Sequence, residues 1–175
     1  MKKKLFSFMV LTALAVTCAT SFTACGGDDD DKPIGNETEK LTVGTHRVDV
    51  DFTGDTSGWS VNVGFVGSGY PDATASKLYE DGKRLELTSG SVWMSEGFRS
   101  YSVSTDDRSQ CLTVMVMLSR REYVTPKAVT VTLKGYVNGK MKKTKSFVAD
   151  GSHTSKTINF NSEAEDADQE IDLDY

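Results

Sequence analysis

The sequence contains few of the residues that staple or interrupt a chain: its 175 residues include three cysteines, three prolines and two histidines. Three cysteines are too few for a disulfide-rich miniprotein. The 15 glycines follow no three-residue period and no heptad pattern recurs, which excludes a collagen-like chain and a coiled coil. Beyond the first two dozen residues no apolar run is long enough for a membrane-spanning helix, so a multi-span membrane protein is excluded as well.

Charge is distributed unevenly along the chain. The formal net charge is −5, but residues 41–160 carry twelve acidic and fifteen basic side chains, whereas residues 161–175 carry seven acidic and no basic ones. Residues 25–40 also have an acidic excess, with six carboxylates and two lysines. A central region with so small a positive excess, flanked by acidic segments, lacks the basic surface that binds phosphates. We therefore expect no nucleic-acid partner.

The N-terminus has the three parts of a secretory signal peptide. Three lysines at positions 2–4 precede an apolar stretch over residues 5–20, and small residues follow at Thr23 and Ala24. The stretch is too short and too rich in threonine for a stable membrane span, although an N-terminal membrane anchor is the alternative interpretation. Removal of residues 1–24 leaves 151 residues for the mature chain, enough for one domain.

Residues 22–25, with the sequence Phe-Thr-Ala-Cys, resemble a bacterial lipobox, although phenylalanine stands where that family usually has leucine. The resemblance implies that Cys25 becomes the first mature residue and carries acyl chains, each buried methylene contributing about 0.8 kcal/mol to membrane attachment. Four aspartates follow after two glycines: Asp28, Asp29, Asp30 and Asp31. They resemble the acidic surface-export signal of Bacteroidota lipoproteins, which implies a lipid-anchored protein exposed at the surface of the outer membrane. The alternative interpretation of these aspartates is a solvated spacer.

Between residues 41 and 160 the apolar residues recur with a period of two, which is the period of a β-strand. Residues 111–118 are apolar on both faces, a pattern typical of a central strand that is covered on both sides. Asp81-Gly82 and Asn138-Gly139 predict hairpin turns, because both residue types in each pair tolerate positive φ. Strict pairing across the second hairpin would turn Phe147 away from the core, so we expect a β-bulge within residues 141–147.

Eight to ten short strands without a long helix predict an all-β fold, an antiparallel immunoglobulin-like β-sandwich over residues 41–160. The alternative is a small closed β-barrel that holds a ligand. Residues 67–72, rich in glycine, are expected to form a loop. Residues 25–40 are predicted to form a flexible acidic tether, and residues 161–175 a disordered acidic tail, because both segments contain few apolar side chains.

Few residues in the sequence are of the types that form catalytic or metal sites. His46 falls in a predicted strand and His153 in a predicted turn, and no nucleophile elbow, phosphate loop or zinc-protease motif accompanies them. Cys111 lies in an apolar run and is expected to be buried as a small hydrophobic residue, with no intrachain disulfide. Asp106 and Asp107 lack the ligand spacing of a calcium loop and predict a solvated turn. We therefore expect no catalytic residue, no metal site and no cofactor.

Two groups of residues are candidate ligand contacts. Lys140, Lys142 and Lys143 crowd the second hairpin, where they could bind an acidic ligand or could protect an edge strand from unwanted pairing. Tyr70 and Trp93 lie beside glycine-rich turns and are expected to offer aromatic faces to a sugar ring. The sequence thus predicts a non-catalytic cell-surface protein that binds a glycan or a protein partner. The alternative is a structural or assembly accessory of an outer-membrane complex.

The lipobox resemblance predicts that Cys25→Ser releases the protein from the membrane. Loss of the acyl chains removes the apolar attachment, so the variant should move to the soluble fraction when cells are fractionated. Cys18→Ser, which alters a cysteine inside the predicted signal peptide, is the matched control and should fractionate as the parent does. A Cys25→Ser variant that stays in the membrane fraction would contradict the lipidation hypothesis.

The same cells test the export signal. Replacement of all four aspartates at 28–31 by alanine should protect the protein from protease added to intact cells, whereas the parent should be cleaved. Equal cleavage of the parent and the variant would indicate that the aspartates serve only as a spacer.

Overall fold

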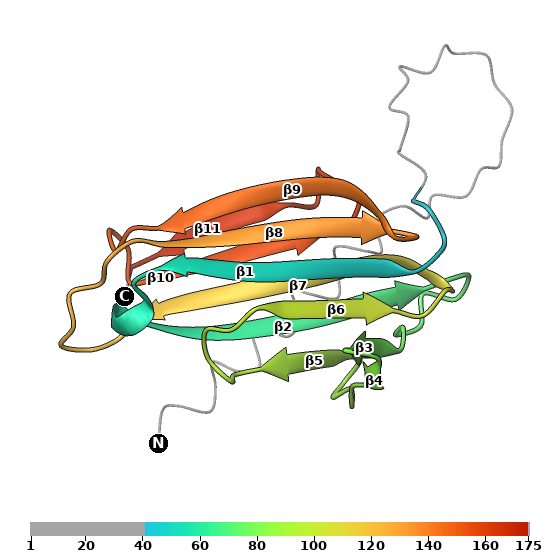
Figure 1. Ribbon diagram of the computed structural model, residues 1–175, viewed down its shortest axis with the longest axis horizontal. Coiled ribbons are helices and arrows are strands. Elements are labelled where there is room, and N and C mark those ends of the chain that lie inside the picture. The colour runs from blue at the N-terminus through green and yellow to red at the C-terminus, as the bar shows by residue number, and fades with distance from the viewer. Residues whose placement is uncertain (1–40, 175) are drawn as a thin grey trace, which may run out of the picture. The chain divides into compact units, whose positions relative to one another are not determined.

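The computed structural model describes residues 41–174, so the predicted signal peptide, Cys25 and the aspartates at 28–31 lie outside the described residues. Residues 41–174 are almost entirely β (Figure 1). The elements are β1 (His46–Gly54), the 3₁₀ turn η1 (Thr56–Gly58), β2 (Trp59–Gly69), β3 (Leu78–Glu80), β4 (Lys83–Arg84), β5 (Ser91–Met94), β6 (Tyr101–Thr105), β7 (Ser109–Arg120), β8 (Val129–Val137), β9 (Lys140–Ala149), β10 (Ser155–Asn161) and β11 (Gln169–Leu173). In this part of the chain no helix reaches the length and hydropathy needed to cross a membrane.

The strands form two antiparallel sheets that pack face to face as a sandwich. The strand order is β4-β3-β6-β1-β8-β9 in the six-stranded sheet and β11-β10-β7-β2-β5 in the five-stranded sheet. Each sheet of the described region ends in two edge strands instead of closing on itself. The predicted immunoglobulin-like sandwich is therefore confirmed, and the alternative of a closed barrel is not what the chain adopts.

The core lies between the sheets and follows the predicted alternation. In β1, Val48 and Val50 are fully buried, whereas the residues between them face outward. In β2 the core side chains are Trp59, Val61, Val63 and Phe65, and the other strands contribute Tyr101, Val103, Leu112, Val114, Val116, Leu118, Val129, Val131, Leu133, Ile158 and Phe160. The branched and aromatic side chains on the inner faces of the two sheets thus form one continuous core.

Strand β7 is the central strand of the five-stranded sheet, as its doubly apolar sequence predicts. It pairs with β2 along one edge and with β10 along the other. Its inner side chains belong to the core, and on the outer face Cys111 and Met115 are buried as well. The expected burial of Cys111 is thus confirmed.

Both predicted hairpin turns are present. Asp81 and Gly82 have φ of 50° and 74°, and Asn138 and Gly139 have φ of 49° and 76°. Two consecutive residues with positive φ match the twist of the adjoining strands. The predicted bulge also occurs, because the β8–β9 register shifts between Gly135 and Tyr136 and so places Phe147 opposite Val131.

One expectation about a strand end was wrong, and one strand was not foreseen. Strand β2 continues through Gly69, whereas residues 67–72 were expected to be a loop. The small residues there leave room for a neighbouring segment: Gly69 N–H donates to the Thr74 carbonyl at 2.7 Å, and a Cβ added at Gly67 would lie 2.8 Å from the Cβ of Ser76. Strand β5 was not foreseen, because its partly buried pattern lacks a regular period.

The C-terminal segment is ordered where a disordered tail was predicted. Residues Gln169–Leu173 form β11, which pairs with β10 from Ser155 to Asn159. The loop that leads into β11 is held by Asp168, whose side chain is only 3% exposed and lies 2.8 Å from both Lys143 Nζ and Lys145 Nζ. Lys143 is itself buried, and its ammonium also donates to the Ala164 carbonyl and lies over the ring of Phe160. Burial lowers the pKa of Lys143, and the Asp168 carboxylate opposes that shift.

The buried ion pair predicts a large effect for Asp168→Asn. The change keeps the shape of the side chain but leaves the buried Lys143 ammonium without a counter-charge, which should lower the free energy of unfolding by about 3 kcal/mol. Thermal unfolding of the two proteins measures this loss. Asp166→Asn, two residues away at an exposed position, is the control and should melt with the parent. Equal melting of the two variants would show that the pair does not hold the C-terminal segment.

Candidate functional site

The five predicted contact residues do not form one site. Tyr70 is 51% exposed in the turn that follows β2, at the end of the sandwich where the Asn138-Gly139 hairpin also lies. Trp93 is on β5, and its ring lies flat over Gly64, since a Cβ there would lie 2.9 Å from three ring carbons. The indole is therefore half-buried packing on the outer face of the five-stranded sheet.

Of the three lysines, one remains an exposed candidate without an ion-pair partner among the described residues. Lys143 is buried against Asp168, which corrects its assignment as a surface contact. Lys142 lies 3.4 Å from Glu163. Lys140 begins β9 at an exposed position. The basic patch expected from the sequence is thus largely neutralised by the acidic C-terminal segment.

The outer face of the six-stranded sheet carries an ordered set of polar side chains, which we call the polar face. Its members are Arg47, Asp49, Asp51, Ser100, Ser102, Lys134 and Tyr136. The alternation of β1 explains the placement: His46, Val48 and Val50 point into the core, so the residues between them point outward. The register puts Asp49 opposite Ser102 on one neighbour and opposite Lys134 on the other.

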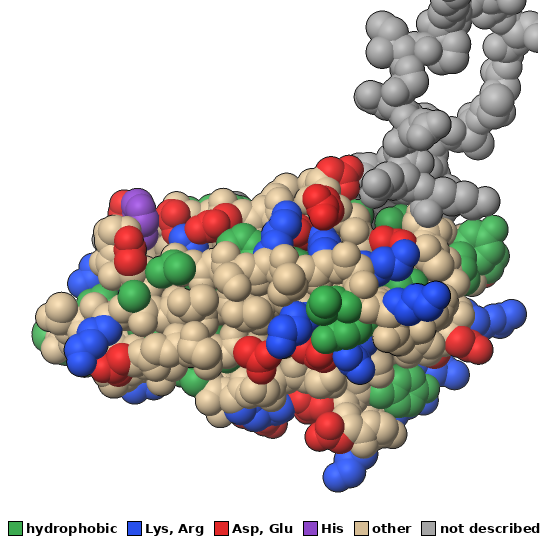
Figure 2. Space-filling view, turned by 45° about the horizontal axis from the view of Figure 1, so that its top comes forward, with side chains coloured by type: hydrophobic (Ala, Val, Ile, Leu, Met, Phe, Trp, Pro, Cys, Tyr) green, Lys and Arg blue, Asp and Glu red, His purple; other side chains and the backbone are tan. Residues whose placement is uncertain are grey.

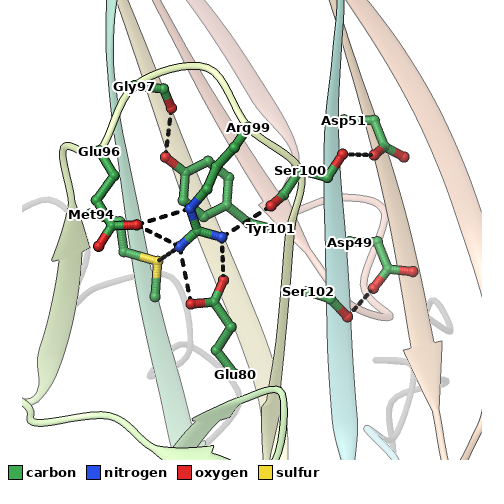
Figure 3. Close-up of polar contacts among 10 residues, drawn as sticks. All are labelled: Asp49, Asp51, Glu80, Met94, Glu96, Gly97, Arg99, Ser100, Tyr101 and Ser102. Carbon is green, nitrogen blue, oxygen red and sulfur yellow. Dashed lines mark hydrogen bonds and ion pairs between the residues drawn. The ribbon is translucent and has the colours of Figure 1, made fainter.

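Hydrogen bonds hold the acidic side chains of the polar face in place. Ser100 Oγ donates to Asp51 at 2.7 Å, and Ser102 Oγ donates to Asp49 at 2.7 Å (Figure 3). Each carboxylate also has a basic neighbour: Arg47 Nε lies 3.1 Å from Asp49, and Lys134 Nζ lies 3.4 Å from Asp51. Arg47 additionally stacks over Tyr136, with its Cζ 3.9 Å from the ring centre. The polar groups are thus fixed while they remain partly open to solvent.

A guanidinium cluster supports one edge of this face and was not foreseen from the sequence. Arg99 donates to both carboxylate oxygens of Glu80, at 2.6 and 3.0 Å, and to Glu96 at 2.9 Å (Figure 3). Its Cζ lies 4.1 Å from the ring centre of Tyr101. These carboxylates, Glu80 first, raise the pKa of Arg99 above its ordinary value.

The Arg99 cluster joins the two sheets. Glu80 belongs to the six-stranded sheet, whereas Met94, whose sulfur lies 3.8 Å from Arg99, belongs to the five-stranded sheet. Tyr101 adds a hydrogen bond from its hydroxyl to the Gly97 carbonyl at 2.7 Å. Residues 95–100 are therefore held in position, and with them Ser100 of the polar face. No sequence spacing signals this arrangement, because Glu80 lies 19 residues before Arg99.

His46 takes part in a buried network that resembles half of a hydrolase triad but has a structural role. The Ser162 hydroxyl donates to His46 Nδ1 at 2.8 Å and accepts from the Leu112 N–H at 3.1 Å. His46 Nε2 then donates to the Thr42 carbonyl at 2.8 Å, which assigns the neutral tautomer. His46 and Ser162 are both fully buried, so no substrate reaches the hydroxyl. The network ties β1, β7 and the loop after β10 together.

The other titratable side chains noted in the sequence also have local roles. His153 is exposed and pairs with Asp174 at 3.1 Å. Asp106 accepts from the Lys77 and Arg108 N–H groups and from the Ser109 hydroxyl, so it caps the β6–β7 turn. Among residues 41–174 no group of three or more histidine, cysteine, aspartate or glutamate side chains is placed to hold a metal ion.

The sandwich is similar to several solved structures of Bacteroides and Parabacteroides proteins. A DUF4425 family protein from Bacteroides ovatus has 18% identity and a TM-score of 0.59, covering 70% of this chain and 98% of its own. A DUF4425 domain from Bacteroides vulgatus has 21% identity and a TM-score of 0.55, covering 69% of this chain and 96% of its own. A protein from Parabacteroides distasonis, solved in a calcium-bound form, has 19% identity and a TM-score of 0.53, covering 82% and 98%. Identities this low establish a shared fold, and no family model or curated protein matches the sequence.

The buried His46 predicts that stability decreases in mildly acidic solution. Burial lowers the pKa of His46 in the folded state from its ordinary 6.5. The unfolded chain therefore takes up this proton first, so the free energy of unfolding falls as the pH drops below about 6.5, by at most about 1.4 kcal/mol per pH unit. Urea unfolding between pH 7.5 and about 5 measures the slope.

His46→Gln should flatten this slope even if it lowers stability at every pH, because glutamine does not titrate. His153→Gln removes the exposed histidine and is the control that should keep the slope. The hypothesis is wrong if the slope survives in His46→Gln and disappears in His153→Gln.

Proposed function

We propose that the protein is a non-catalytic, lipid-anchored module of the bacterial cell surface that binds a glycan through the polar face. The observation that carries this proposal is the cross-strand hydrogen bonding of Asp49 and Asp51, which fixes two carboxylates on an otherwise flat sheet. Anchorage is supported by the lipobox-like residues that end at Cys25 and by the aspartates at 28–31. Binding is supported by the geometry of the described residues.

The charges of the polar face favour a neutral, hydroxyl-rich ligand. Two carboxylates face two cations there, so the face has no net charge to attract a phosphate or a polyamine. A carboxylate offers about four lone-pair positions, and the serine and basic partners leave acceptor capacity on each. Sugar hydroxyls can both donate to these oxygens and accept from Arg47 and Lys134. Such ready-made hydrogen-bonding groups reduce the ordering that binding requires.

Aromatic and serine side chains complete the chemistry expected of a sugar-binding surface. Tyr136 is on β8, and Arg47 of β1 stacks over its ring. The ring can also pack against the apolar face of a pyranose. Ser102 and Ser100 add hydroxyl groups along the same stripe.

The proposal predicts that at least one soluble neutral polysaccharide retards the protein in native affinity electrophoresis. The probes are a β-glucan, a xylan, a mannan and a starch, with polygalacturonate as the acidic comparison. The double change Asp49→Ala and Asp51→Ala should weaken retardation by about tenfold or more, since each hydrogen bond to a charged group contributes about 1.5–3 kcal/mol. Its thermal unfolding should stay close to that of the parent, because both side chains are partly exposed.

Asn62→Ala is the matched control, since Asn62 is an exposed polar residue on the outer face of the other sheet. It should bind as the parent does. Retardation that is equal in parent and double variant would place the ligand elsewhere, and the absence of retardation by all five probes would remove the glycan proposal.

A further inference from the structure

The loop between β7 and β8, residues 121–128, ends in an exposed apolar tip. Tyr123 has a relative exposure of 101%, and the adjacent Val124 is 40% exposed. The backbone of Tyr123 is left-handed, with φ of 65°. Side chains with a Cβ rarely adopt this conformation, which glycine takes without steric cost. The tip therefore combines an unfavourable backbone with side chains that add nothing to the core.

The base of the loop, in contrast, is firmly held. The Arg121 N–H donates to the Gly58 carbonyl at 2.9 Å, and the indole N–H of Trp59 donates to the Lys127 carbonyl at 2.7 Å. Pro126 sits against two glycines, because a Cβ at Gly58 or at Gly151 would lie 2.6 Å from an atom of Pro126. Both legs of the loop are thus fixed to the sandwich, so the tip is presented in a defined position.

We propose that the 121–128 loop docks Tyr123 and Val124 into an apolar pocket on a protein partner. An exposed tyrosine in a fixed position resembles the anchor residues that carry much of the energy in protein interfaces, because it brings large apolar area with few torsions to order. The tip projects from the end of the sandwich and lacks the fixed polar groups found on the polar face, so a pocket suits it better than a sugar chain does.

The charges at this end of the sandwich favour a protein over a membrane. Basic Arg120, Arg121 and Lys127 share it with acidic Asp55, Asp150 and Asp174, and Figure 2 shows both signs mixed at the left end of the molecule. An anionic lipid surface attracts a segment with a clear basic excess, which this end lacks. A mixed rim around an apolar centre is typical of protein interfaces.

The position of the loop fits a surface module. The chain enters the sandwich at the His46 end of β1, whereas the loop joins β8 at Val129, opposite Gly54 at the other end of β1. Nine strand residues separate these ends, a span of roughly 30 Å. This step alone depends on the proposed anchorage through Cys25, and the loop lies at the end of the sandwich away from the point where the chain enters β1.

The test places photoreactive p-benzoyl-phenylalanine at position 123 of the full-length protein, in the bacterium that produces it, and irradiates intact cells. The benzophenone ring is the probe, and we expect one discrete protein adduct with the crosslink in a single apolar segment of the partner. Tyr70, 51% exposed at the opposite end, is the matched control position, and it should give about tenfold less of that adduct because it lies outside the interface. Val124→Asp in the position-123 protein should remove most of the adduct, since it brings an unpaired charge into an apolar pocket.

Three results would overturn the proposal: no adduct from position 123, adducts of equal yield from positions 70 and 123, or attachment to lipid or polysaccharide. Thermal unfolding of Tyr123→Gly is the second measurement. Glycine relieves the left-handed backbone, so its melting temperature should equal or exceed that of the parent. A lower melting temperature would give Tyr123 a role inside the domain and would also contradict the proposal. Polysaccharide retardation of Tyr123→Ala should be unchanged, so failure at the loop is distinguishable from failure at the polar face.

Discussion

The central position of β7 is the constraint on which the rest of the structure depends. Its hydrogen bonds are used on both edges, by β2 and β10, and its side chains are buried on both faces over most of its length. The register of the sheet comes from the neighbours, whose two faces differ in polarity. In β2, for example, Val63 is buried and Asn62 exposed, and a slip of one residue would exchange them. The inner face of β7 then sets where the six-stranded sheet can pack. That packing in turn sets the orientation of β1 and of the polar face.

The acidic and basic segments of the chain serve this architecture as well as the surface. Asp168 neutralises Lys143 and Lys145. Glu163 accepts hydrogen bonds from Thr42, at the start of the domain, and forms an ion pair with Lys142. The lysines expected to form a binding patch are therefore largely neutralised within the fold. The polar face and the 121–128 loop remain as surfaces of different kinds, one flat and hydrogen-bonding, the other projecting and apolar. Because they lie on different parts of the sandwich, one copy has room for a glycan and a protein partner at once.

The parts of the fold that were predictable are those with a local signal. The alternation in β1 and β2, the apolar run of β7 and the Asn138-Gly139 turn each carry their own pattern, and even the bulge in β9 follows from the need to bury Phe147. Strands β5 and β11 each depend on a neighbour that pairs with them, since β5 has no regular burial period and β11 is exposed throughout.

The site was less predictable, for the same physical reason. Whether Lys143 is a surface cation depends on Asp168, 25 residues further along the chain. The polar face depends on a register between three strands, and the Arg99 cluster on Glu80, which lies 19 residues before Arg99. The left-handed backbone of Tyr123 has no residue-type signal at all, since tyrosine is a poor choice for it. Contacts between distant segments, which set these features, cannot be derived from one segment at a time.

The pairing of β1 with β8 has a consequence for the order of events during synthesis. The first strand of the domain finds that partner only after most of the chain exists, since His46 pairs with Val137 and Gly54 with Val129. Domains dominated by such non-local pairing fold slowly, in milliseconds to seconds, because a long loop must close before its contacts form. A chain that emerges from its N-terminus therefore cannot complete the six-stranded sheet until β8 is available. Under the proposed export of this protein, such a delay would keep the polypeptide unfolded while it crosses the membrane.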